Sequence, residues 1–584
     1  GVPIIDTVQN PIIGDSEGIH LVVPRSSTKE CIDFICKDLQ TAADYLPARW
    51  ESENKNFGRI TSGAALALKG RVELLYASPL FNRADDVTRW ETAYQTNLAA
   101  VKKLEEGNFG LAYENNSGKN AAGWGKIFSD YIGSEGGGGT VSEAVLVTLY
   151  NNVSPAEHLQ LEKWNGWEHS LRPANAGGGG GMTPTAEMVD LFPMADGKKP
   201  NDMNGSYDYN QELFFLNRDP RFYRTFAFPG VEWKFDSDDL KSFGEKGQLP
   251  YGINGYTTGN NYKLWNYCWY DNVDDRNSNS KSGYAADCLG TKNTGIYLRK
   301  RTDDLALNSN PLYIFEKTSG NGFRQSAAPY MEIRFAEVLL NYAEAACGAN
   351  HFDEAVIALK RIRKRVGYTD NCGLDPAIFN DRAKLFEAIL YERQIELAYE
   401  GKRFHDVRRW MLFDGGVGQE ALKSTWKLTG FNGNTCNYLG VEPLNGQRRH
   451  RIEVYAKNFI AAKSNNVYNE DKTIKETYDE LWNKRPTALS LTEDITCTES
   501  ADDEITYADA KVKALAQFYQ EHFKRKNLST DGNDETILPT FKPYYYILGF
   551  KKNAMQNNVS LEQNIGWGDY WRGGADGTFD PLAE

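Results

Sequence analysis

The residues best suited to binding are aromatic and lie in the stretch YKLWNYCWYDNVDDR, Tyr262 to Arg276. Flat rings with polar edges can stack on the C–H faces of sugars while nearby amide, carboxylate and guanidinium groups bind the hydroxyls. The predicted ligand-binding residues are Trp265, Asn266, Tyr267, Trp269, Tyr270, Asp271 and Arg276. If the segment is extended, alternate side chains share a face, which groups Trp265, Tyr267 and Trp269. The alternative interpretation is a buried strand, because large aromatics also dominate cores.

A second candidate binding segment contains Trp164 and Trp167, followed closely by a run of glycines at Gly177–Gly181. Glycine runs have no helix or strand preference, so this one could act as a hinge. The sequence predicts that the two tryptophans bind ligand on a loop that closes over it. The alternative is a loop whose tryptophans are anchored in the core.

Catalytic motifs do not stand out in the sequence. It has no G-x-S-x-G, H-E-x-x-H or Walker A pattern, and no G-x-G-x-x-G after a strand. Asp271, Asp274 and Asp275 offer oxygen ligands for calcium, but they lack the spacing of an EF-hand. We therefore predict a protein that is not an enzyme and that has no cofactor and no metal site. With 79 Asp and Glu in the chain, a glycosidase carboxylate pair stays open as an alternative.

Tyr391 to Trp410, YERQIELAYEGKRFHDVRRW, carries charge on almost every turn and still keeps an apolar stripe. The spacing predicts an interior-facing helix that stops at Glu400–Gly401, then a second helix or turn with Phe404 and Val407 inward. Charged residues one turn apart can pair along a helix. We expect a structural network at a salt-bridged rim, formed by Arg393, Glu396, Glu400, Arg403, Asp406 and Arg409.

The amino-acid sequence of this stretch resembles the C-terminal signature of the SusD/RagB family. Members of that family are surface lipoproteins of Bacteroidetes that capture nutrients for a TonB-dependent transporter. Further segments resemble the family's in the same order: Gly58 to Asn82, Pro184 to Lys198 with Asn217 to Phe222, Tyr330 to Ala346, and Asn557 to Trp567. The opening GVPIIDTVQNPI resembles a segment that lies well inside such proteins. The resemblance therefore implies a further N-terminal region and a lipid anchor, neither of which is in this chain.

Helical periodicity predicts the elements that must position these residues. Apolar residues recur at helical spacing over 28–46, 61–77, 90–107, 330–345, 355–366, 385–400 and 508–524, and Arg451 to Tyr455 looks like a strand. The resemblance implies paired helices of the tetratricopeptide type. We predict a mostly α fold, with a tetratricopeptide-like helical-repeat scaffold and a large, irregular, loop-rich second region.

The predicted division of the chain has five parts. They are an N-terminal part of the scaffold (1–107), a loop-rich ligand-binding region (108–328), helical-repeat hairpins (329–411), a loop-rich insertion (412–507), and a C-terminal helix with a terminal turn (508–584).

Composition excludes several classes of partner. The formal net charge of −13 argues against nucleic acid, whose phosphates require a basic face. The absence of a long apolar run excludes a membrane-spanning helix. The chain holds 13 Trp, 32 Tyr and 28 Phe, many of them in polar segments, which favours a sugar-binding surface.

Together these features predict a lipid-anchored protein on the extracellular face of the outer membrane. It captures an oligosaccharide and delivers it to a SusC-like TonB-dependent transporter, for which it acts as the lid. The alternatives are the same scaffold binding peptides, a surface endo-glycosidase, and a tetratricopeptide scaffold that binds only protein.

Overall fold

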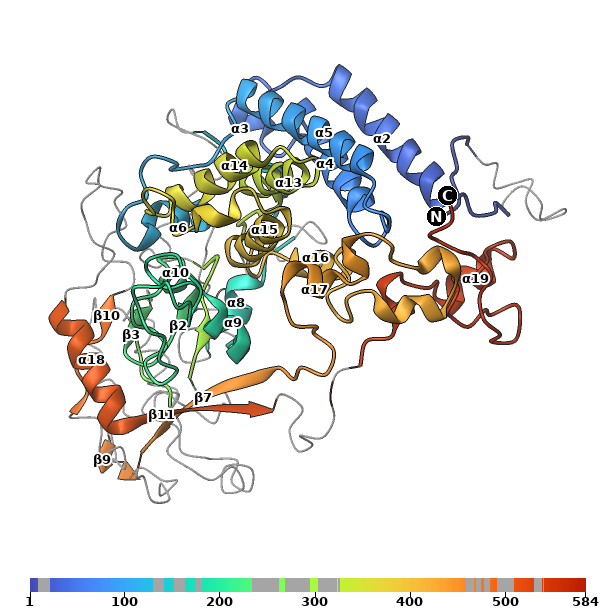
Figure 1. The fold of residues 1–584 in the computed structure, drawn as a ribbon. Coiled ribbons are helices and arrows are strands. Elements are labelled where there is room, and N and C mark those ends of the chain that lie inside the picture. The colour runs from blue at the N-terminus through green and yellow to red at the C-terminus, as the bar shows by residue number, and fades with distance from the viewer. Residues whose placement is uncertain are drawn as a thin grey trace.

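The fold is mostly helical, with many irregular segments between the helices (Figure 1). The computed structural model describes residues 1–8, 22–129, 141–151, 163–173, 181–233, 262–267, 295–302, 323, 326–457, 467–468, 474–476, 484–490, 509–529, 538 and 540–584.

The first layer consists of the helices α2 (Thr28–Tyr45), α4 (Ser62–Ala77) and α5 (Val87–Glu106), drawn in blue in Figure 1. Side chains cap each N-terminus: Ser27 forms a capping box with Glu30, Thr61 accepts from the Ala64 amide, and Asp86 accepts from the Thr88 amide. Helix α4 packs against both α2 and α5. Ile35 of α2 is 41% exposed, so this helix turns part of its apolar stripe to solvent.

The second layer contains α13 (Phe335–Gly348), α14 (Phe352–Arg365) and α15 (Arg382–Glu396), drawn in yellow in Figure 1. Helix α13 is buried along its whole length and packs against α5, α14 and α15. It therefore forms the centre of the helical core, and its short turn into α14 makes one of the predicted helical hairpins.

The end of α15 and the start of α16 (Arg403–Arg409) follow the predicted break. Tyr399 and Gly401 adopt left-handed backbone angles, with φ of 61° and 78°, and no helix continues through them. Val407 is buried, as predicted. The prediction for Phe404 is wrong, because this side chain is 55% exposed and lies near the Arg408 guanidinium, 5.0 Å from the ring centroid.

Short strands form several small sheets. They are β1 (Ala144–Thr148) with β6 (Tyr330–Arg334), β2 (Phe226–Ala227) with β5 (Tyr297–Leu298), β3 (Val231–Trp233) with β4 (Tyr262–Leu264) and β10 (Leu489–Ser490), β7 (His450–Ala456) with β11 (Phe523–Ser529), and β8 (Val467–Tyr468) with β9 (Ile474–Glu476). All pair antiparallel except β10 with β3. The remaining α-helices are α3 (Glu53–Asn56), α6 (Ala122–Ser129), α8 (Trp167–Leu171), α9 (Ala186–Leu191), α10 (Phe222–Thr225), α17 (Thr435–Leu439), α18 (Asp509–His522) and α19 (Lys552–Asn557).

Two main cores hold these layers together. The helical core contains Trp90 and Trp410, both fully buried, with Phe386 between them. The other core gathers residues of β2, β3, β4, β5, β7, β10, β11 and α18, and it includes Trp233 and Phe214. The five-part division of the chain stays a prediction.

The two ends of the chain lie side by side (Figure 1). The N-terminal ammonium of Gly1 donates to Thr28 Oγ1 over 3.0 Å, and Thr28 Oγ1 donates to the Pro581 carbonyl over 2.6 Å. Among the described helices, none combines the length and the apolar composition needed to cross a bilayer.

Candidate functional site

The described part of the predicted aromatic surface lies in the core. Trp265 and Tyr267 are 5% and 0% exposed, and their rings pack against Phe518 and Phe523 at centroid distances of 5.7 and 4.7 Å. Asn266, between them, is also buried and donates to the Tyr297 hydroxyl over 2.8 Å. Both faces of the segment are therefore covered in this structure, although the three residues follow β4 and are not part of a strand. A ligand role for them stays a prediction.

The other members of that predicted surface are Trp269, Tyr270, Asp271 and Arg276, which lie outside the described residues. A ligand role for them stays a prediction. The acidic residues Asp274 and Asp275, considered for calcium, lie outside the described residues as well.

Trp164 and Trp167 are half-buried. Trp167 begins α8, and its Nε1 donates to the Lys300 carbonyl over 3.0 Å. The Arg301 guanidinium lies 3.9 Å from the centroid of the Trp167 ring and so covers one of its faces. This ring is anchored to the protein, and a ligand role for the two tryptophans stays a prediction.

The charged motif forms a buried network. Glu396 Oε1 accepts from Arg334 Nη1 over 2.7 Å and from Arg365, and its Oε2 accepts from Arg221 Nη1 over 2.8 Å. Glu400 pairs with Arg334 and with Lys300 Nζ, both at 2.7 Å. The predicted structural role therefore holds, but the prediction of a rim is wrong. The carboxylates are fully buried, and these cations come from other elements.

A second part of the network lies at the start of α16. Asp406 pairs with Arg393 at 3.1 Å and with Arg409 at 2.8 Å, and Arg409 also pairs with Glu344. Burial alone would raise the pKa of Asp406, but the two guanidinium groups lower it well below its usual range. These carboxylates stay ionised and are committed to arginines, so they are poor candidates for acid–base catalysis.

A groove of about 640 Å³ lies beside this network and is the candidate binding site. Helices α9, α15 and α16 contribute to its walls, together with residues 412–449. Its lining residues are Thr185, Glu187, Met188, Leu191, Lys199, Glu387, Leu390, Tyr391, Gln394, Arg403, Phe404, Val407, Leu412, Phe413, Leu439, Val441, Glu442, Leu444, Gln447 and Arg449. Apolar walls with a few polar groups, in a volume of this size, are typical of small-ligand sites.

The charges that line the groove are not equally matched. Lys199 pairs with Glu387 at 2.5 Å, and Glu187 accepts from His450 Nδ1 over 2.6 Å. Arg403, in contrast, has no carboxylate within 4.0 Å among the described residues, although the sequence places it in the structural network.

The pKa of Arg403 also reflects its lack of an ion-pair partner among the described residues. The pKa of Arg403 is lowered to about 10, chiefly by burial. Asp406 acts against this shift, while the nearby Arg449, Arg409 and Arg393 contribute to it. The Arg403 guanidinium thus lies at the groove wall in surroundings richer in positive than in negative charge.

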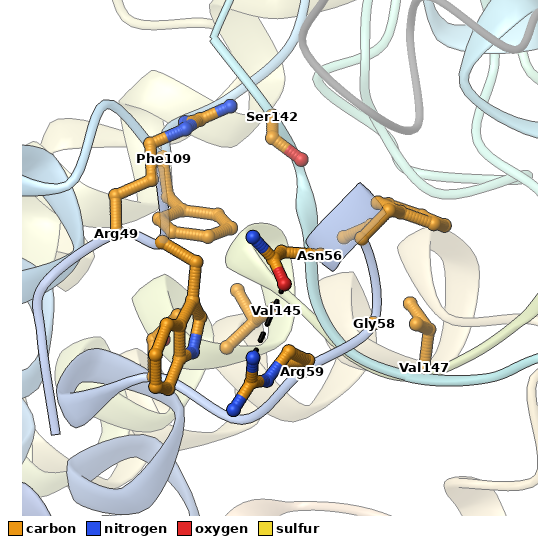
Figure 2. A pocket seen from close by; sticks show the side chains of 12 residues that line it. Arg49, Asn56, Gly58, Arg59, Phe109, Ser142, Val145 and Val147 are labelled. Atoms are coloured by element: carbon orange, nitrogen blue, oxygen red, sulfur yellow. Dashed lines mark hydrogen bonds between the residues drawn. The ribbon is translucent and has the colours of Figure 1, made fainter. Parts of the chain in front are cut away.

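A smaller hollow lies beside Trp50 (Figure 2). Arg59 donates to Asn56 Oδ1 over 3.2 Å, and its guanidinium lies 3.8 Å from the centroid of the Trp50 ring. The cavity is about 40 Å³, close to the ~30 Å³ share of one water molecule in the liquid. It is too small for a sugar ring.

Sequence reasoning missed the groove, because its walls come from segments far apart in the chain that carry no shared motif. The sequence feature that could have pointed to the groove is Phe404, an aromatic residue in a charged stretch. Helical spacing alone assigns it to the core, whereas the short length of α16 leaves it on the wall.

Three comparisons place the chain among known proteins. The model of the SusD family matches residues 125–567, which is most of the chain. The "SusD-like protein P2" of Formosa agariphila is 34% identical over 131 residues, a match that spans 20% of this chain and 25% of that relative. The crystal structure of a SusD-like protein from Bacteroides fragilis NCTC 9343 superposes with a TM-score of 0.54 at 20% identity, covering 97% of this chain and 75% of that one.

Proposed function

The chain belongs to the SusD family, and from this premise we propose that it is a substrate-binding protein of the cell surface. It captures an oligosaccharide and delivers it to a SusC-like TonB-dependent transporter of the outer membrane. The family match over residues 125–567 is the observation that carries this proposal. The fold shared with a SusD-like protein supports it.

The groove supplies surfaces that an oligosaccharide needs. Phe404, which is 55% exposed, offers ring area to the C–H faces of sugars, while Gln394 and Gln447 offer amide donors and acceptors for hydroxyls. A volume of about 640 Å³ is enough for a short run of sugar units.

The remaining parts of the proposal follow from family membership. The protein sits on the extracellular face of the outer membrane through an N-terminal lipid, and it acts as the lid of the transporter. Binding energy from stacking and hydrogen bonds holds the ligand at the lid until the transporter takes it, and no covalent step is involved.

Binding without turnover is the first testable expectation. The motif carboxylates Glu396, Glu400 and Asp406 are buried and paired, so they are not available to a glycosidic oxygen. Calorimetry with purified protein and a panel of oligosaccharides should show saturable binding, and chromatography should recover the ligand unchanged. Steady release of new reducing ends at catalytic protein concentrations would show an endo-glycosidase instead. Binding to peptides alone would show the peptide-capturing alternative.

A further inference from the structure

Arg403 is a cation that the fold positions at the groove without a matching anion. It is the first residue of α16 and is half-buried, yet no described carboxylate lies within 4.0 Å of its guanidinium. Nearby Asp406 is already shared by Arg393 and Arg409. A charge removed from water without a partner is destabilising, so proteins usually pair it or use it.

The other charged groups of the groove do not remove this imbalance. Glu387 is held by Lys199, and Glu187 by His450. Glu442 lines the groove but is exposed to solvent, where its charge is screened. The half-buried Arg403 therefore gives this part of the groove wall a positive character.

We propose that the captured oligosaccharide is anionic, and that Arg403 binds its carboxylate or sulfate group within the groove. This inference rests on the proposed function and names the substrate class of the same site. A guanidinium presents paired N–H donors that match the oxygens of either oxyanion, and such charge-assisted contacts are stronger than neutral hydrogen bonds.

The neighbouring residues fit the rest of such a ligand. Phe404, next in sequence, is 55% exposed on the groove wall. A sugar ring can rest against an aromatic face while its acidic substituent reaches Arg403. A guanidinium can also donate to neutral hydroxyls, but only an anionic substituent would supply the opposite charge that Arg403 lacks among the described residues.

The test compares charged oligosaccharides with uncharged partners of the same backbone. One arm uses oligogalacturonides against their methyl esters, and the other uses carrageenan oligosaccharides against their desulfated forms. Calorimetry is run on the wild type, Arg403→Gln, Arg403→Lys and, as a control for net charge, Arg572→Gln, whose side chain is exposed on the C-terminal turn.

We expect the wild type to prefer the charged member of at least one pair by about tenfold or more, the scale of a hydrogen bond to a charged group. Arg403→Gln should abolish that preference while leaving the affinity for the neutral member unchanged. Arg403→Lys should retain part of the preference, and Arg572→Gln all of it. A preference among the oligogalacturonides would identify the bound group as a carboxylate, and a preference among the carrageenan oligosaccharides would identify it as a sulfate.

Other outcomes overturn the inference. If the wild type binds neutral and charged members equally, or if Arg403→Gln keeps the preference, the groove does not select anions through this residue, and the proposed function still stands. If no oligosaccharide binds and peptides with a free C-terminal carboxylate do, both the inference and the proposed function are wrong. Arg403→Gln should unfold no earlier than the wild type, because it removes an unpaired charge, and thermal denaturation checks this.

Discussion

Glu396 links more elements than any sequence pattern around it suggests. Its two oxygens accept hydrogen bonds from Arg221, Arg334 and Arg365, which lie beside α10, at the end of β6 and at the end of α14. Trp124 of α6 also donates to Oε1, over 2.9 Å. Replacing all members of a buried ion-pair cluster with apolar residues often leaves stability unchanged. Removing one member is destabilising, because it leaves the remaining buried charges with one opposite charge fewer. This carboxylate is therefore a point at which the loop-rich part and the helical part depend on each other.

Glu396→Gln should lower thermal stability strongly. The amide keeps the shape of the side chain but leaves three arginines facing one neutral group, at a cost of about 3–5 kcal/mol. Differential scanning fluorimetry should show an earlier unfolding transition. The control is Glu420→Gln, since Glu420 is exposed and lies 4.0 Å from Lys427, a pair that contributes little. Unchanged stability in Glu396→Gln would show that the network is not structural.

Glu400 gives the protein a defined acid limit. Burial alone would raise its pKa, but Arg334 and Lys300 lower it from 4.5 to about 2. The ionised carboxylate therefore stabilises the fold above pH 4.5, and this contribution is lost as the pH falls through about 2. The shift corresponds to about 3 kcal/mol at most. Urea unfolding at pH 6 and pH 3 should show a smaller loss of stability for Glu400→Gln than for the wild type. Equal losses of stability in the variant and the wild type would show that other groups cause the destabilisation at low pH.

Residue types alone could not settle which aromatic and charged side chains are exposed. The alternation of Trp265, Asn266 and Tyr267 predicts one solvent-exposed face. In the structure α18, β5 and β11 provide a partner for each of the three, so the segment is covered on both sides. Similarly, Glu396 on a charged helix looks solvated, yet its arginines arrive from distant segments that spacing cannot connect.

At the scale of elements, periodicity predicted several helices and one strand well. The predicted ranges 61–77 and 508–524 correspond closely to α4 and α18, and the strand at Arg451 to Tyr455 lies within β7. The predicted end of the helix at Glu400 is late, because Leu397 to Glu400 turn away from α15 as the chain approaches Gly401. The groove could not be predicted, since it depends on how α9, α15 and α16 are placed.

Gly348→Val should weaken the packing of α13 against α5. Gly348 ends α13, and a Cβ there would overlap the ring of Trp90, which is fully buried between Phe386 and Trp410. Overpacking of a dense core costs about 1–3 kcal/mol. Chemical denaturation should show the loss. The control is Gly166→Ala, where a Cβ would meet nothing within 4 Å. A variant as stable as the wild type would mean that the two helices can move apart freely.

At the scale of the whole molecule, the formal net charge of −13 opposes the positive patch that we infer at Arg403. Long-range repulsion acts on an anionic ligand before it reaches the groove, whereas the guanidinium acts at contact distance. Salt screens exposed charges beyond a Debye length of about 10 Å at 0.1 M, and it screens partly buried contacts much less. The two effects can therefore be separated by their dependence on salt.

The association rate of an anionic oligosaccharide should rise as salt increases from about 10 to 100 mM, because the Debye length shrinks from about 30 to about 10 Å over that range and the repulsion of the whole molecule is screened. The dissociation rate should also rise, though less, because salt weakens the Arg403 contact. Stopped-flow fluorescence can measure both rates, with the uncharged form of the same oligosaccharide as the control that should not respond. If association instead slows as salt is added, the local field of the groove outweighs the total charge and steers the ligand in. Arg403→Gln should then reverse that sign, which would locate the steering field at this residue.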